Sequence, residues 1–316
     1  MSTTYLVTGG AGFIGGHLTR KLIDLGHTVR VIDNLSTGKR ENLTDVLDKI
    51  TFIEGDITDA ETVRGAVDGV DYVLHQAALP SVPRSVRDPL TSDFHNTHGT
   101  LRLLVAARDA GVKRVVQACS SSAYGDTPTL PKVETMKRSP LSPYACSKAA
   151  GEMYGCAFFS TYGLEYVGLR YFNVFGPRQD PTSQYAAVIP KFITAYMRGE
   201  PSTVFGDGKQ SRDFAFIDNV VQANLKACTA PDAPGKIFNI ACGERTDLLR
   251  VIDLLGEIFG GRIEPRFEPA RPGDVKHSLA DITLARELLG YEPEVLFADG
   301  LKRTVEWYRA QADGGQ

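Results

Sequence analysis

Short apolar runs alternate with longer amphipathic stretches over the first half of the chain. The short runs predict strands at residues 5–8, 28–32, 50–54, 71–75, 114–118 and 165–170. The longer stretches predict helices at residues 13–25, 89–110 and 142–162, and in the second of these Leu101, Leu104 and Val105 share one face. Strands that alternate with helices predict an α/β fold built on a parallel, doubly wound sheet.

The pattern changes after about residue 171. Glycine, proline and aspartate become frequent, as in residues 176–181 and 206–208. We therefore expect a main domain over residues 1–170 and a smaller, loop-rich lobe over residues 171–212 and 236–316. Residues 213–235 resume the strand-then-helix rhythm and are expected to return to the main domain. Such a lobe closes over the carboxyl edge of the sheet, where ligands bind.

Composition restricts the class of protein. With 316 residues, 42% of them hydrophobic, and a net charge of −3, the chain predicts a globular protein that binds neither nucleic acid nor a membrane. No apolar run approaches the ~18 residues needed to span a bilayer, and no leader-like segment is visible. The five cysteines lack paired spacing and the six histidines lack an HExxH pattern, so we expect a cytoplasmic protein without a metal site.

Three glycines follow the first predicted strand and open the first predicted helix. Gly9 permits a tight turn, Gly12 lets a phosphate approach the backbone, and Gly15 lets the helix pack closely against the strand. A pyrophosphate can then bind the free N–H groups at the start of the helix. The spacing predicts a dinucleotide site, in which we include the intervening Phe13 and Ile14.

An acidic residue ends the second predicted strand. A carboxylate at Asp33 accepts hydrogen bonds from the adenosine ribose and repels a 2′-phosphate, which favours NAD over NADP. The following Asn34 is included in the cofactor site. Lys39 and Arg40 lie nearby and could serve a phosphate, so NADP stays open as the alternative.

Tyr144 and Lys148 lie one turn apart on one face of the predicted helix at 142–162. A free tyrosine, with a pKa of about 10, is a poor base at neutral pH, but an adjacent ammonium and a positively charged nicotinamide both favour the phenolate. The fifth strand ends in Ser120, Ser121 and Ser122, where a hydroxyl can orient or relay a substrate proton. The pattern predicts hydride transfer at an alcohol carbon; the alternative is a surface Tyr–Lys pair beside a polar turn.

Together, these motifs resemble the extended short-chain dehydrogenase/reductases that act on nucleotide sugars. The motifs stand in the family's order at residues 8–15, 75–78, 120–125, 144–148, 169–173 and 212–214. Within that family the chain is most similar to UDP-hexose 4-epimerases, and residues 130–134, 185–191 and 273–281 carry a closer likeness to those acting on UDP-N-acetylglucosamine. The resemblance implies a Rossmann fold, NAD as cofactor, a UDP-sugar substrate and a homodimer formed through the helices at 89–110 and 142–162.

The resemblance also implies roles for individual residues. Tyr144 and Lys148 are catalytic together with Ser120 or Ser121; counting back from Tyr124 favours Ser120, whereas a gapped alignment selects Ser121 or Ser122. The further cofactor-binding residues are Asp56, Ile57, Ala77, Ala78, Asn96 and Phe172. The substrate-binding residues are Ser81, Ser122, Asn173, Val188, Arg212, Arg271, Asp274 and Ser278, of which Asn173, Arg212, Arg271 and Asp274 bind the UDP portion.

The residues after the catalytic serine distinguish the family's reactions. Dehydratases need an Asp/Glu pair there and decarboxylases usually carry a glutamate in the same turn, whereas Ser121 and Ser122, or Ser122 and Ala123, stand there in this chain. The reaction that remains is 4-epimerisation through a transient 4-keto sugar. A UDP-glucuronate or UDP-pentose 4-epimerase and a catalytically silent NAD-binding protein are the alternatives.

The sugar preference is expected to depend on Ser278. By family match it stands where a bulky residue would close the pocket around C2 of the sugar. A small side chain leaves room for an N-acetyl group. We therefore expect UDP-GlcNAc and UDP-GalNAc as substrates, with UDP-glucose and UDP-galactose used less efficiently.

Overall fold

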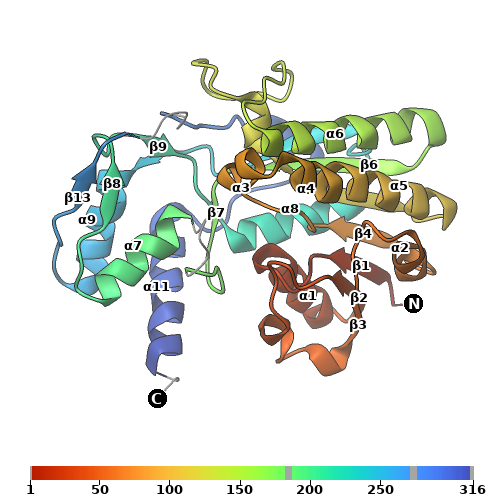
Figure 1. The fold of residues 1–316 in the computed structure, drawn as a ribbon, viewed down its shortest axis with the longest axis horizontal. Helices are drawn as coiled ribbons and strands as arrows, with labels where there is room; N and C mark the ends of the chain where they lie inside the picture. The colour runs from red at the N-terminus through yellow and green to blue at the C-terminus, as the bar shows by residue number, and fades with distance from the viewer. Residues whose placement is uncertain (1, 182–186, 271–275, 314–316) are drawn as a thin grey trace.

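A seven-stranded parallel sheet forms the centre of the computed structural model, which describes residues 2–181, 187–270 and 276–313 (Figure 1). The strand order is β11-β6-β5-β4-β1-β2-β3. The strands are β1 (Thr4–Thr8), β2 (Thr28–Asp33), β3 (Ile50–Glu54), β4 (Tyr72–His75), β5 (Arg114–Ser120), β6 (Glu165–Tyr171) and β11 (Lys236–Ile240). The predicted α/β fold with a parallel, doubly wound sheet is therefore confirmed.

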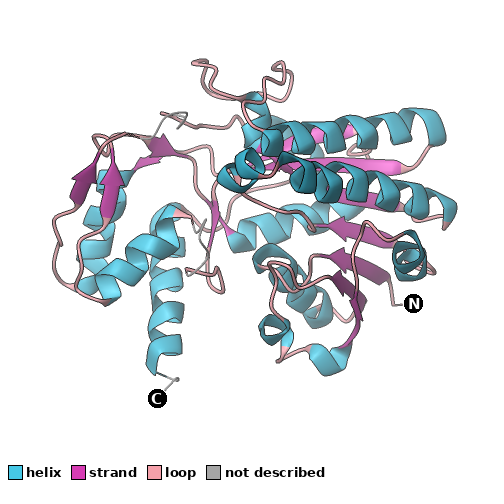
Figure 2. Ribbon diagram, in the orientation of Figure 1, coloured by secondary structure: helices cyan, strands magenta, loops and turns pink. Residues whose placement is uncertain are grey.

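Helices cover both faces of this sheet (Figure 2). Tyr5 and Val7 of β1 belong to one hydrophobic core cluster and the intervening Leu6 belongs to the other, as the two-residue period of a strand requires. The first cluster packs under α1 (Phe13–Asp24) and α8 (Ile217–Thr229), and the second under α2 (Ala60–Val67), α5 (Gly99–Asp109) and α6 (Pro143–Tyr162). Burial on both faces explains why the strands read as apolar runs.

The predicted helix at 89–110 is a helical segment in three parts. It consists of α4 (Pro89–Asp93), a wider π-helical turn η3 (Phe94–His98) and α5. The short α3 (Val82–Arg87) precedes it. In Figure 1 these helices lie alongside α6, with which α3, α4, η3 and α5 are all in contact.

The segment that returns to the sheet differs from the expectation. β10 (Ala215–Phe216) pairs with β7 (Val174–Phe175) rather than with the central sheet, although α8 does pack against β5 and β6. The strand that joins the sheet is β11, which pairs with β6. The assignment of all residues after 235 to the lobe is therefore wrong for β11, whose Ile237, Phe238 and Ile240 are buried in the two cores.

The remaining C-terminal elements form a lobe beyond the carboxyl ends of the strands, on the left in Figure 1. Its helices are α7 (Val188–Met197), α9 (Leu248–Phe259) and α11 (Phe297–Asp313), whereas α10 (Thr283–Leu289) packs against β11 and α8. Its strand pairs are β8 (Thr203–Phe205) with β13 (Arg266–Glu268) and β9 (Ser211–Arg212) with β12 (Thr246–Asp247).

Short 3₁₀ turns η1 (Arg40–Leu43), η2 (Leu47–Lys49) and η4 (Ser121–Tyr124) complete the described chain. Within that described part, no helix has both the length and the apolar composition that crossing a bilayer requires.

Candidate active site

The glycine loop between β1 and α1 has no room for side chains at two of its positions. Gly9 has a φ of +69°, and a Cβ there would lie 2.8 Å from the backbone of Ala77. A Cβ on Gly15 would lie 2.2 Å from the carbonyl oxygen of Gly9. Gly12 caps α1 without a side-chain hydrogen bond. The first N–H groups of the helix are thus not capped from within the chain, as binding of a pyrophosphate requires.

Asp33 ends β2 and is almost completely buried. Its carboxylate oxygens accept hydrogen bonds from the N–H groups of Ala11 (2.9 Å) and Leu35 (2.8 Å). Burial raises the pKa of this carboxyl group, and the two hydrogen bonds oppose that shift. The carboxylate is thereby fixed beside the glycine loop, where an adenosine ribose binds in folds of this kind.

The two cations near Asp33 are each paired with a carboxylate. Nζ of Lys39 lies 3.0 Å from Oδ2 of Asp180, and Nη1 of Arg40 lies 3.5 Å from Oε2 of Glu54. Such partly exposed pairs add little stability. They do compete with a 2′-phosphate for the cations, which agrees with a preference for NAD over NADP.

A cleft of about 730 Å³ follows the carboxyl ends of β2, β1, β4 and β5. The predicted cofactor residues that line it are Gly9, Gly12, Phe13, Ile14, Gly15, Asp33, Asn34, Ile57, Ala77, Ala78, Tyr144 and Lys148. Because β2 and β5 are three strand spacings apart, the cleft is at least about 14 Å long. Its length, with Asp33 at one end, the glycine loop in the middle and Tyr144 at the other end, fits a dinucleotide.

Three predicted cofactor residues are not among the described residues that line this cleft. Asp56 accepts a hydrogen bond from Nδ2 of Asn34 (2.6 Å). The amide of Asn96 bonds to both the N–H and the carbonyl of Leu79, at 2.7 and 3.2 Å. Phe172 is fully buried, while the adjacent Tyr171 lines the cleft. Asn96 and Phe172 are buried, whereas Asp56 is partly exposed beside Asn34. Direct cofactor contact by these three side chains stays a prediction.

Tyr144 and Lys148 project from the first turns of α6 into the end of the cleft beside β5. The Lys148 ammonium is buried and donates to the carbonyl of Ala118 (2.9 Å). Burial lowers the pKa of Lys148 and raises that of Tyr144, and the nearby side chain of Ser120 opposes the shift at Tyr144. A phenol next to a hydroxyl and an ammonium can take up and return a proton at this end of the cleft.

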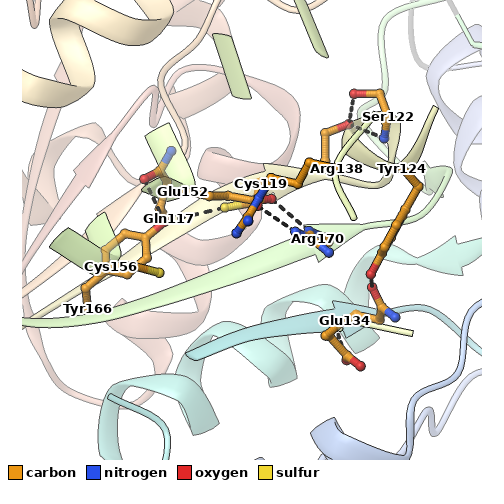
Figure 3. A network of polar contacts seen from close by, with 12 residues as sticks. Gln117, Cys119, Ser122, Tyr124, Glu134, Arg138, Glu152, Cys156, Tyr166 and Arg170 are labelled. Atoms are coloured by element: carbon orange, nitrogen blue, oxygen red, sulfur yellow. Dashed lines mark hydrogen bonds and ion pairs between the residues drawn. The ribbon is translucent and has the colours of Figure 1, made fainter. Parts of the chain in front are cut away.

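The structure distinguishes the three serines at the end of β5. Ser120 is the last residue of the strand, and of the three serines its side chain is the one that lies near enough to Tyr144 to lower the pKa of the phenol. The hydroxyl of Ser122 donates to Oγ of Ser120 (2.8 Å), as the dashed line in Figure 3 shows. Ser121 begins the 3₁₀ turn η4. The Ser120 hydroxyl is therefore hydrogen-bonded to Ser122 and near Tyr144, which lines the cleft.

A second cavity, of about 1030 Å³, lies between the C-terminal lobe and the strand ends. It is lined by Asn173, Val188 and Arg212 of the predicted substrate residues. Pro181 and Ala187 line both cavities, so the two adjoin. An elongated ligand can therefore extend from the lobe toward Tyr144.

The other predicted substrate residues differ in position. Oγ of Ser278 accepts a hydrogen bond from Nδ2 of Asn173 (3.1 Å), which lines the second cavity. Ser81 is the N-cap of α3, where its Oγ accepts from the N–H of Arg84 (3.1 Å), and it has a strained φ of +115°. Arg271 and Asp274 lie outside the described residues, and their roles stay predictions.

Sequence reasoning missed residues that support the catalytic helix. Ser85 is fully buried, and its Oγ accepts a hydrogen bond from the N–H of Tyr144 (3.0 Å). Glu152, two turns beyond Tyr144, forms a buried ion pair with Arg170. No local pattern marks either residue, because the partners lie 59 and 18 positions away in the sequence.

Fold and site together define a protein of the NAD-binding Rossmann class, with Tyr144, Lys148 and Ser120 at one end of its cofactor cleft. Among the described residues, no group of three or more His, Cys, Asp or Glu side chains is arranged to hold a metal ion. Comparison with known proteins identifies the family.

The model of the NAD dependent epimerase/dehydratase family matches residues 5–241. The UDP-glucose 4-epimerase of Mycolicibacterium smegmatis is 42% identical over 308 residues, which are 96% of this chain and 98% of that protein. The crystal structure of a UDP-glucose 4-epimerase from Thermotoga maritima with UDP-glucose has a TM-score of 0.93 at 42% identity, covering 98% of this chain and 100% of that chain. A UDP-N-acetylglucosamine 4-epimerase from Methanobrevibacter ruminantium, in complex with UDP-N-acetylmuramic acid, has a TM-score of 0.94 at 41% identity, covering 98% and 99%. The chain belongs to the NAD-dependent epimerase/dehydratase family, which confirms the predicted resemblance.

Proposed function

We propose that this enzyme interconverts UDP-N-acetylglucosamine and UDP-N-acetylgalactosamine and, less efficiently, UDP-glucose and UDP-galactose. That the chain is a UDP-sugar 4-epimerase follows from its family and from relatives more than 40% identical over nearly its whole length. The choice of N-acetylated sugars is supported by the likeness of residues 185–191 and 273–281 and by the small side chain at Ser278.

Each residue at the closed end of the cofactor cleft has a part in the proposed reaction. Tyr144 takes the proton of the sugar's O4 hydroxyl and later returns it. Ser120 orients that hydroxyl, and Ser122 is hydrogen-bonded to Ser120. The bound NAD supplies the acceptor that takes hydride from C4 and gives it back. Lys148, held by the carbonyl of Ala118, places a positive charge near the phenolate.

Inversion at C4 requires the hexose to turn within the site. The UDP portion does not react, so tight binding there can retain the intermediate while the hexose stays free to rotate. Arg212, which lines the second cavity, carries the planar fork of N–H donors suited to a diphosphate. Asn173, two residues after the end of β6, lines the same cavity and is proposed to bind the UDP portion together with Arg212.

Carboxylates are located away from the reacting end of the cleft. Among the described residues that line it, the carboxylates are Asp33, Glu41 and Asp180. Asp33 is the last residue of β2, Glu41 follows in η1, and Asp180 is paired with Lys39 of the same region. With Ser121 and Ser122 after Ser120, the turn itself carries no acid to eliminate water from the keto sugar, which supports epimerisation over dehydration.

The position of Tyr144 and of the buried Lys148, which line the end of the cofactor cleft beside β5, carries the proposal. The test is an NMR assay of the purified protein with UDP-GlcNAc, UDP-glucose, UDP-glucuronate and UDP-xylose, each deuterated at C4. We expect product without added NAD, full retention of deuterium and a kcat/KM about tenfold higher for UDP-GlcNAc than for UDP-glucose. Loss of deuterium to water would contradict the mechanism, and a preference for UDP-glucuronate would contradict the substrate.

We further propose that two copies associate through the layer formed by α4, η3 and α6. Isolated apolar side chains on a surface are ordinary, but a group of them marks an interface. Leu90 of α4, Phe94 of η3 and Met153 of α6 are 83%, 48% and 55% exposed, and α4 packs directly beside α6. Two such layers facing each other would bury these side chains in a four-helix arrangement.

A further inference from the structure

The catalytic helix carries a third ionisable side chain on the face that presents Tyr144 and Lys148. Glu152 follows Lys148 by one turn and Tyr144 by two turns, and it is fully buried. Its Oε1 accepts from Nε of Arg170 (2.9 Å), and its Oε2 accepts from Nη2 of Arg170 (2.7 Å). Nε of Arg138 donates to the same Oε2 (2.7 Å). Figure 3 shows both arginines converging on this carboxylate.

Arg170 also contacts the turn that follows the catalytic serine. It is 1% exposed and lies on β6 opposite Cys119 of β5, one residue before Ser120. Its guanidinium carbon lies 4.5 Å from the centroid of the Tyr124 ring, within the range of a cation–π contact. Tyr124 ends η4, the turn that begins directly after Ser120. Arg170 is therefore in contact with both the catalytic helix and the serine-bearing turn.

Tyr124 is itself fixed from the far side. Its hydroxyl donates to Oδ1 of Asn239 on β11 (2.6 Å), as Figure 3 shows. The N–H of Asn239 in turn donates to Oε1 of Glu134 (2.8 Å). Because Tyr124 is held between β11 and the guanidinium, any displacement of Arg170 is transmitted to η4.

We propose that Glu152 and Arg170 are positioning residues for the reaction, which hold α6 in register with η4 so that Tyr144 meets Ser120. The inference rests on the proposed 4-epimerase function of the site. Neither side chain lines the cofactor cleft among the described residues, so both act through Tyr144, Lys148 and Ser120.

The form of the contact favours a geometric role over a purely stabilising one. A buried ion pair gives up hydration, and well-packed apolar side chains would often hold the helix at least as firmly. Apolar contacts have no direction, however, whereas the paired N–H groups of a guanidinium fix a carboxylate in one orientation. A slip of α6 by one residue would move Tyr144 about 1.5 Å along the helix axis, enough to separate the reacting groups.

The charge of Glu152 has a second effect on the same helix. Burial lowers the pKa of Lys148, and the thiol of Cys119 and the carboxylate of Glu152 act in the opposite direction. The other titratable group facing Lys148 is His75 of β4, whose pKa burial lowers to about 3, so that it is neutral. Removing the Glu152 carboxylate would leave the positive charges of Arg170 and Arg138 without this counter-charge, two helical turns from Tyr144.

Three variants test the positioning role. Glu152→Gln keeps the size of the side chain and removes its charge. The double variant Glu152→Leu/Arg170→Met replaces the pair by apolar groups and leaves no unpaired buried charge, so it is expected to fold even where the single variant does not. Arg138→Gln is the matched control, because Arg138 binds the same carboxylate from a partly exposed position and does not contact Tyr124.

We expect both Glu152 variants to lower kcat by about 10- to 100-fold. Affinity for UDP by calorimetry and the amount of bound NAD should change by less than about twofold, because neither residue lines either cavity. The deuterium isotope effect at C4 should rise, since the hydride step becomes more rate-limiting. Arg138→Gln should retain kcat within about threefold.

Two results would overturn the proposal. One is a double variant with the wild-type kcat and isotope effect. The other is a crystal structure of the double variant in which Tyr144 keeps its position relative to Ser120, which would exclude a positioning role whichever substrate the enzyme uses. The failure of the wild type to epimerise any UDP-hexose would count against the proposed function, whereas the structural comparison would still decide the role of the pair.

Discussion

Nδ2 of Asn173 donates a hydrogen bond to Oγ of Ser278 over 3.1 Å, and the two residues lie 105 positions apart in the sequence. The N–H of Asp213 also approaches the same hydroxyl, at 3.4 Å. Asn173 has a φ of +30°, an uncommon conformation for a residue other than glycine. The Ser278 hydroxyl thus connects three segments beside the substrate cavity, and a substitution there changes both the space near the sugar and the support of Asn173.

Filling the space at Ser278 should change the choice of sugar. Ser278→Tyr is expected to lower kcat/KM for UDP-GlcNAc at least about tenfold and to spare UDP-glucose, because the larger ring occupies the volume proposed for the N-acetyl group. Ser278→Ala is the control, since it removes the hydrogen bond to Asn173 without filling space and should affect both sugars equally. Equal losses for both sugars in Ser278→Tyr would show that the hydrogen bond, rather than the volume, matters.

Removing the hydroxyl that contacts Tyr144 should be the most harmful of the serine substitutions. We expect Ser120→Ala to lower kcat by about 100-fold, a typical contribution of a group that takes part in proton transfer. Ser122→Ala should have a smaller effect, because its hydroxyl acts through Ser120. Ser121→Ala should stay within about threefold. Steady-state kinetics on the three variants would refute this assignment if Ser121→Ala were the most impaired.

Removing the ammonium next to Tyr144 should shift the pH dependence of the reaction. Burial raises the pKa of Tyr144, and a positive charge at Lys148 favours the phenolate. Lys148→Met should therefore move the acidic limb of the kcat profile to higher pH, with a large loss at pH 7 that is partly recovered in alkali. Lys148→Arg retains the charge and should keep the limb close to its wild-type position. An unchanged limb in Lys148→Met would show that the charge does not tune Tyr144.

Stability should depend on pH through Asp213, a buried carboxyl group between β9 and β10. It accepts hydrogen bonds from the N–H groups of Cys242, Gly243 and Ala280 at 2.9, 3.1 and 3.1 Å. Burial raises its pKa from 3.8 to about 7. Between about pH 4 and 7 the folded state then holds more protons than the unfolded state, so this group makes the free energy of unfolding fall as the pH rises.

The Asp213→Asn variant, which does not titrate, isolates this contribution. The difference in the free energy of unfolding between wild type and variant should change between pH 5 and pH 8 by at least about 1.4 kcal/mol, the equivalent of one pKa unit, with the wild type relatively less stable at pH 8. Urea unfolding at the two pH values measures it. A difference that does not vary with pH would show that the carboxyl group is ionised throughout.

A charge in the apolar layer of α4 and α6 should dissociate the proposed dimer. Leu90→Glu/Met153→Glu places carboxylates at two exposed apolar positions, and burying them in an interface is unfavourable. Sedimentation velocity should show a dimer for the wild type and a monomer for this variant. Leu25→Glu, at a 51% exposed position after α1 on the other face of the sheet, should remain dimeric. A monomeric wild type would contradict the proposal.

Local patterns in the sequence were sufficient for much of the fold and for the core of the site. β1, the glycine loop and α1 are consecutive, so the spacing of Gly9, Gly12 and Gly15 already predicted the phosphate-binding turn. Tyr144 and Lys148 lie one turn apart on α6, and their common face follows from the helical repeat alone. Strands buried on both faces gave continuous apolar runs that the sequence shows directly.

Contacts between distant segments were decided only by the tertiary structure. The segment Lys236–Ile240 has the composition of a strand, but its sequence does not indicate whether it pairs with β6 or joins the lobe. Ser120, Ser121 and Ser122 are the same residue type in one turn, and only the packing of α6 against β5 determines which hydroxyl reaches Tyr144. The pairing of Glu152 with Arg170 likewise depends on how a helix and a strand approach each other, because hydrogen bonds and ion pairs act over a few ångströms in space and leave no periodic signal along the chain.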